Sequence, residues 1–95
     1  MTTDEQRRFT RLTLDDTTVG VIDVESGVEF TADGRDLGGE GLRFSAPMEP
    51  CLGADMQVVL RGKDPRLPPL RATFRVLRVT RATSGWDVAG TLHRL

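Results

Sequence analysis

Three arginines gather near the start of the chain, in the segment RRFTR that spans residues 7–11. Arg7, Arg8 and Arg11 each carry a planar guanidinium group, which can donate two parallel hydrogen bonds to a phosphate or to the edge of a guanine base. A guanidinium can also stack on an aromatic ring, which lysine does less well. Of the 13 basic residues in the chain, all but Lys63 are arginine. The cluster therefore has the chemistry of a clamp for a negatively charged, planar ligand.

A second segment with binding chemistry is GRDLGGEGLRF, residues 34–44, in which glycines stand close to a carboxylate. Dense glycines indicate either a tight turn with positive φ or a place where the backbone approaches another group closely. A carboxylate beside exposed backbone N–H groups can accept hydrogen bonds from the N1 and N2 edge of guanine. The segment thus fits either a hairpin turn or a binding loop. The candidate binding residues are Asp36, Gly38, Gly39 and Gly41.

Residues suited to catalysis or metal binding are scarce elsewhere. The chain has one histidine, His93, one cysteine, Cys51, and no tyrosine, too few to build a metal site or a catalytic triad. Asp15 and Asp16 are adjacent, and in an extended chain their side chains would point to opposite faces. We therefore predict that the protein is not an enzyme and uses no metal or cofactor.

The segments that must position these residues have the pattern of β-strands, rich in Val, Ile, Thr and Phe with alternating apolar and polar positions. They cover residues 17–24, 27–37, 41–47, 55–60, 70–82 and 85–95. In the longest segment the alternation slips at Val76 and Leu77, which indicates a β-bulge, after which Leu77 and Val79 would share a face. No long segment has the period of an amphipathic helix.

Ninety-five residues, 38% of them hydrophobic, are enough for one core. We predict a single all-β domain over residues 1–95, with a flexible arginine-rich arm at 1–11 and a small antiparallel β-barrel at 12–95. Little or no helix is expected, and a barrel is favoured because closure protects strand edges. No stretch approaches the roughly 20 apolar residues of a transmembrane helix, and no signal peptide is visible. We therefore expect a cytoplasmic protein.

The charge pattern narrows the possible ligands. A formal net charge of -1 argues against a polybasic protein that holds nucleic acid by charge alone, and few aromatic residues are present to stack on RNA. Arg71, Arg75 and Arg78 could form an outward stripe on the segment 70–82. Such a stripe either discourages edge-to-edge aggregation, the usual role of charged strand faces, or contacts a ligand or partner.

Taken together, the arginine cluster and the glycine-rich segment resemble the PilZ domain family, the bacterial receptors for cyclic di-GMP. That family carries an RxxxR or RRxxR motif in a flexible segment before a β-barrel, and a D/N-x-S-x-x-G motif some twenty to thirty residues later. Here RRFTR matches the first motif, and DLGGEG at 36–41 matches the second except that Gly38 replaces the serine. The order of strands is also similar, so the resemblance extends from Arg7 to Leu92.

The resemblance implies a receptor that signals to an unidentified protein partner through ordering of the arm. The arginines of RRFTR would clamp the phosphates and the O6 and N7 edges of cyclic di-GMP. Asp36 would accept the guanine N1–H and N2–H at the glycine-rich turn. The alternative is a degenerate PilZ domain that binds no nucleotide and acts as a protein-interaction module in motility or secretion. Neither nucleic acid binding nor membrane insertion is expected.

Overall fold

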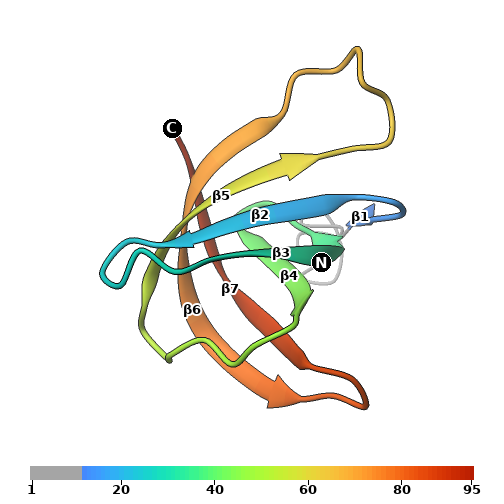
Figure 1. Cartoon of the computed structure of the whole chain (residues 1–95). Helices are drawn as coiled ribbons and strands as arrows, with labels where there is room; N and C mark the ends of the chain where they lie inside the picture. The colour runs from blue at the N-terminus through green and yellow to red at the C-terminus, as the bar shows by residue number, and fades with distance from the viewer. Residues whose placement is uncertain (1–11) are drawn as a thin grey trace, which may run out of the picture.

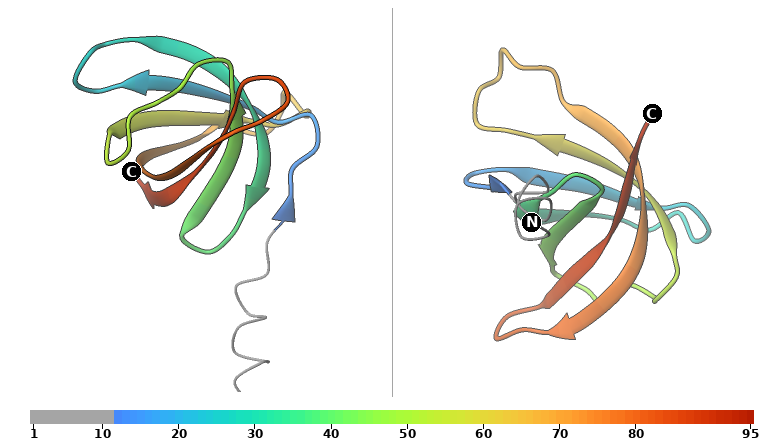
Figure 2. Two further views of the ribbon diagram at one scale, coloured as in Figure 1. Left: turned by 90° about the horizontal axis from the view of Figure 1, so that it is seen from below. Right: turned by 180° about the vertical axis from the view of Figure 1, so that it is seen from behind.

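The computed structural model describes residues 12–95, which form seven antiparallel strands (Figure 1). The strands are β1 (Leu12–Thr13), β2 (Thr18–Asp23), β3 (Glu29–Leu37), β4 (Gly41–Ala46), β5 (Asp55–Arg61), β6 (Leu70–Arg81) and β7 (Trp86–Arg94). Six of them close into a barrel in the order β3-β2-β5-β6-β7-β4, with β4 pairing back onto β3 (Figure 2). The short β1 adds to β3. The prediction of a small antiparallel β-barrel without helix is thus confirmed for these residues. The described part of the chain contains no helix that could cross a bilayer.

The barrel interior is filled by one side of each strand from β2 to β7, as the alternation in the sequence predicts. Phe44 on β4 and Phe74 on β6 lie in this core with ring centroids 5.2 Å apart, a separation typical of favourable aromatic pairs. Among residues 12–95 no polar or charged residue is buried. The core is therefore held by burial of apolar surface, at about 1.5–3 kcal/mol for each large side chain.

The strand β3 pairs with β2 on one edge and with β4 on the other, and the pairing with β4 closes the barrel. The pairing with β2 covers the first half of β3, the pairing with β4 covers the second half, and Asp33 is paired with both. A register shift between Gly34 and Asp36 marks a β-bulge in the second half. Asp36 has β4 on one edge, and on its other edge Thr13 of β1 continues the place of β2. Strand β1 thus lies beside Asp36. The predicted arm of residues 1–11 lies outside the described residues.

A second bulge lies in β6, where the register against β7 shifts between Val76 and Arg78. The sequence predicted this bulge, and this is confirmed. It also predicted that Leu77 and Val79 share a face, which is wrong. Leu77 is the extra, unpaired residue and is 60% exposed, whereas Val79 packs partly against the core. Because an inserted residue reverses which way the following side chains point, Arg78 faces outward, opposite Ala89.

Gly90 on β7 is a position where packing leaves no room for a side chain. A Cβ atom there would lie 2.7 Å from Cζ of Phe74 and would overlap the backbone oxygen of Arg75. At Gly41 of β4, by contrast, the nearest neighbour of such an atom is the Gly90 oxygen at 3.6 Å, an ordinary contact. Glycine at position 90 therefore lets β7 pack directly on the Phe74 ring.

We expect Gly90→Ala to lower the free energy of unfolding by about 2–3 kcal/mol, because the added methyl group overpacks the core. Urea denaturation at neutral pH measures the change. Gly41→Ala is the matched control in the neighbouring strand and should change the stability by less than about 1 kcal/mol. Equal stability of Gly90→Ala and the wild type would contradict the close approach of β7 to Phe74.

Candidate functional site

The glycine-rich segment forms a hairpin turn in which residues 38–40 join β3 to β4. The N–H of Gly38 donates to the Gly41 oxygen at 2.9 Å, and the N–H of Leu92 on β7 donates to the Glu40 oxygen at 2.8 Å. The described glycines with positive φ all lie elsewhere: Gly27, Gly53 and Gly85. The glycines of this turn are therefore not needed for a left-handed backbone. Of the two explanations for dense glycines, an open backbone that another group can approach is the one that fits.

Asp36 and Arg43 face each other directly across this hairpin. The Nε and Nη2 atoms of Arg43 lie 2.7 and 2.6 Å from Oδ2 of Asp36, and Nη1 lies 3.2 Å from each carboxylate oxygen of Asp87 on β7. The three side chains are half-buried, with Asp36 the least exposed at 17%. Arg43 thus links two carboxylates from different strands, and we call this group the Arg43 cluster.

The electrostatics of the Arg43 cluster keep its arginine charged. The pKa of Arg43 is raised above its ordinary value, first by the hydrogen bond to Asp36 and further by Asp87, although partial burial acts against this. One guanidinium serves two carboxylates, so the oxygen of Asp36 that is free within residues 12–95 would attract a hydrogen-bond donor. Arg78, across Ala89 in the same row, adds a second positive charge, so the Arg43 side of the row is not negative overall.

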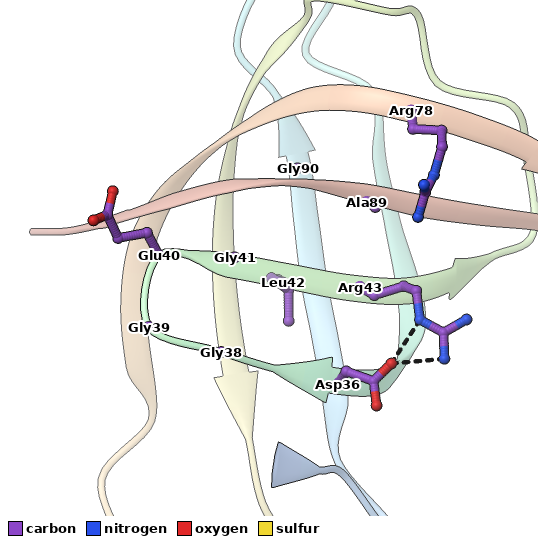
Figure 3. Close-up of a pocket in the computed structure, with 10 residues that line it drawn as sticks. All are labelled: Asp36, Gly38, Gly39, Glu40, Gly41, Leu42, Arg43, Arg78, Ala89 and Gly90. Carbon is purple, nitrogen blue, oxygen red and sulfur yellow. Dashed lines mark hydrogen bonds and ion pairs between the residues drawn. The ribbon is translucent and has the colours of Figure 1, made fainter. Parts of the chain in front are cut away.

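A hollow of about 340 Å³ lies beside the cluster on the outer face of the barrel, and we call it the outer groove (Figure 3). Its edges are the glycine-rich turn and Arg43 on one side and Arg78 of β6 on the other, with Ala89 of β7 between them. Figure 3 shows the Arg78 side chain lying over β7 toward Ala89, while Glu40 points away from Asp36. The groove is open because its floor carries only a methyl group.

Strand register explains why these residues meet. Arg78 is paired with Ala89 on β7, Ala89 is paired with Arg43 on β4, and Arg43 is paired with Asp36 on β3. The four residues form one row that runs across four neighbouring strands. Since paired Cα atoms are about 4.5–5.5 Å apart, the backbones of the two arginines are separated by about 10 Å across the alanine.

The structure brings part of the predicted binding set together. Four of the seven predicted binding residues line the outer groove together: Asp36, Gly38, Gly39 and Gly41. The other three lie outside the described residues 12–95: Arg7, Arg8 and Arg11.

Sequence reasoning did not select Arg43, although it is the residue that holds Asp36. A signal for it was present, because positions 36 and 43 stand at equal distances from the midpoint of the segment 38–41. A hairpin folded at that turn pairs the two residues, and opposite charges in directly paired positions attract each other. The turn was read as a possible binding loop rather than as the centre of a register, and so the partner of Asp36 was missed.

The predicted stripe of strand arginines is not one surface. Arg75 donates from Nε and Nη2 to the two carboxylate oxygens of Asp55, at 2.9 and 3.1 Å, and this pairing lowers the pKa of Asp55 below its ordinary value. Arg71 lines a different hollow, formed over β2, β3 and β5 on the other half of the barrel. Only Arg78 of the three reaches the outer groove.

Comparisons with known proteins provide no relative for this chain. It matches no protein-family model, and searches of curated proteins and of solved structures gave no match either. The site is interpreted from its own geometry and from its motifs.

Removing the cation from the Arg43 cluster should destabilise the fold. Arg43→Gln leaves Asp36 and Asp87 without their partner, and we expect the free energy of unfolding to fall by about 1–2 kcal/mol at neutral pH, a modest value because Arg43 is partly exposed. Urea denaturation measures the loss. Arg71→Gln, at an exposed position outside the cluster, is the control and should change stability by less than about 0.5 kcal/mol. An equal effect of both substitutions would show that the cluster contributes nothing specific.

Proposed function

We propose that the protein is a bacterial second-messenger receptor that binds cyclic di-GMP, as the resemblance to the PilZ family implies. The observation that supports this most is the pairing of β1 with β3. Leu12, which directly follows the RRFTR segment in the chain, lies opposite Leu37, the neighbour of Asp36. The first described residue after the RRFTR motif is thus paired next to Asp36 of the second motif.

The residues of the two motifs offer a partner for each chemical group of cyclic di-GMP. Guanine N1–H and N2–H would donate to Asp36, whose Oδ2 receives Arg43 and whose Oδ1 receives no hydrogen bond from residues 12–95. Arg7, Arg8 and Arg11 would bind the phosphates and the O6 and N7 edges, and one guanidinium could stack on a base. The open glycine backbone would let the base lie close to the strands.

Signalling would follow from ordering of the arm. A segment with several arginines and little apolar surface gains order when it closes on a doubly charged ligand. The closed arm would change the surface around β1 and the glycine-rich turn, and a protein partner would bind that changed surface. In this scheme the barrel is a rigid support, and the arm is the element that responds.

A second function is favoured by two features of the site, the engagement of Asp36 and the glycine at position 38. Its carboxylate is already held by Arg43, and Gly38 offers no hydroxyl group where the PilZ motif has serine. Both features fit a degenerate PilZ domain that binds no nucleotide and serves as a protein-interaction module in motility or secretion. The affinity for cyclic di-GMP separates the two functions.

Isothermal titration calorimetry of the full chain with cyclic di-GMP should detect binding that GTP and GMP do not reproduce. Arg7→Ala, Arg11→Ala and Asp36→Ala should each weaken it by about 1.5–3 kcal/mol, the range for hydrogen bonds to charged groups. For Asp36→Ala the unfolding free energy must be measured as well, because this residue also pairs with Arg43.

Two strand variants serve as controls for that titration. Arg71→Ala and Arg75→Ala should change the affinity by less than about 0.5 kcal/mol, since Arg71 lies on the other half of the barrel and Arg75 is paired with Asp55. Larger losses in these variants than in the arm variants would mean that the ligand binds a different face. No binding by the folded wild type would leave the interaction module as the function.

The departure from the family motif gives a further prediction. Gly38→Ser should tighten binding of cyclic di-GMP by on the order of 1 kcal/mol, about fivefold in Kd, by supplying a hydroxyl group. The φ angle of Gly38 is not in the left-handed region, so serine should fit the backbone and leave Tm unchanged. Calorimetry and thermal unfolding of the same variant test both points. Unchanged affinity at unchanged Tm would mean that position 38 does not contact the ligand.

A further inference from the structure

We propose that Arg78 and Arg43 form a phosphate-binding subsite over Ala89, which extends the nucleotide site from the glycine-rich turn across β7 to β6. This inference deepens the proposed function and rests on it for the identity of the ligand. The class of group bound, a phosphate or phosphodiester, follows from the outer groove itself. Arg78 belongs to neither of the two motifs.

The geometry of the outer groove suits a tetrahedral anion. Arg78 and Arg43 flank Ala89 in one row of the sheet, and the methyl group between them leaves the space above β7 open (Figure 3). A phosphate carries several acceptor oxygens, so it can receive hydrogen bonds from two guanidinium groups that approach from opposite sides. A larger residue at position 89 would fill the place where the anion is expected.

Arg78 differs in its charge pairing from Arg75 on the same strand and from Arg43 across Ala89. Arg75 is neutralised by Asp55, and Arg43 is held by its own cluster. Within residues 12–95, no carboxylate forms an ion pair with Arg78, and Arg78 is exposed. Its guanidinium is therefore available for a ligand, and Arg43 can turn a donor toward the same ligand while it stays between its two carboxylates.

Backbone geometry gives a second, independent reason to assign a role to Arg78. Even-numbered residues of β6 up to Val76 point into the core, and an unbroken strand would point residue 78 inward as well. The bulge at Leu77 reverses this and puts Arg78 on the outer face at Ala89. The bulge in β3 likewise turns Asp36 to the outer face. In an unbroken strand Asp36 would point inward, as Gly34 does. Both irregularities of the barrel thus turn a charged residue toward the same groove, and bulges are enriched beside functional sites for this reason.

The first test uses inorganic pyrophosphate on the full chain, observed by ¹⁵N NMR. Binding at the subsite should shift the backbone amide of Ala89 and the side-chain Nε–H groups of Arg78 and Arg43 in a saturable way, and the shifts of Ala89 and Arg43 should disappear in Arg78→Gln. Arg61 and Arg71 line the hollow of about 420 Å³ on the other half of the barrel and serve as an internal control. Equal shifts at that hollow, or shifts at Ala89 that persist in Arg78→Gln, would overturn the subsite.

The second test measures cyclic di-GMP affinity by calorimetry. Arg78→Gln should weaken binding about tenfold or more, whereas Arg71→Gln should change it less than twofold. Ala89→Glu puts a carboxylate between the arginines and should weaken binding at least as much. Thermal unfolding of each variant confirms that the barrel is intact.

The two tests distinguish a wrong subsite from a wrong proposed function. If the wild type binds cyclic di-GMP and Arg78→Gln binds equally well, the subsite is wrong and the proposed function stands. If the wild type binds no cyclic di-GMP but pyrophosphate still shifts Arg78 and Ala89, the proposed function is wrong and the anion subsite stands.

Discussion

Closure of the barrel through β3 is the constraint on which the rest of the structure depends. This strand pairs with β2 on one edge and with β4 on the other, because an open sheet of this size would leave two edges unpaired. The two pairings are staggered along β3, and the stagger has two consequences near Asp36. The hairpin to β4 aligns Asp36 with Arg43, and the edge that β2 no longer covers becomes available to β1. The candidate site is therefore built at the seam of the barrel, where the pairing is least regular.

The two bulges determine which charges appear on the outer face. Alternation in a strand is strict, so one inserted residue exchanges the inner and outer faces for everything that follows. In β3 this exchange turns Asp36 outward and lets Leu37 pack against the core, and in β6 it turns Arg78 outward and Val79 toward the core. The core stays apolar at both bulges, because Leu37 follows Asp36 and Val79 follows Arg78. On the outer face, Asp36 and Arg78 lie at the two ends of the row that crosses β3, β4, β7 and β6.

Alternating apolar residues were enough to predict the strands β2 to β7 and the bulge at Val76, since each of these depends on local sequence, whereas the short β1 was not predicted. The barrel was predicted from the need to protect strand edges. The bulge in β3 was not predicted, because Gly34 has no side chain to mark the inner face there. Arg43 was missed because the glycine-rich turn was read as a binding loop and not as the centre of a hairpin. Arg78 was named only as part of a possible stripe, because its partners lie on other strands and the register across β4, β7 and β6 is a property of the closed barrel. The sequence motifs identified the glycine-rich turn, whereas the place of Arg78 on the other side of the outer groove was identified only from the fold.

The engagement of Asp36 by Arg43 does not by itself prevent Asp36 from binding a ligand. Removing one partner of a fully buried ion pair costs about 3–5 kcal/mol, but this pair is partly exposed, where such interactions contribute closer to 1 kcal/mol. Arg43 also has Asp87 within 3.2 Å on its other side, so it can loosen its bond to Asp36 without losing all compensation of its charge. A guanine that donates two hydrogen bonds to Asp36 replaces the donors it displaces, and a phosphate near Arg43 offers that arginine a new acceptor. In the proposed receptor, the cluster would then act as a set of exchangeable hydrogen bonds for a ligand that carries both a guanine edge and a phosphate.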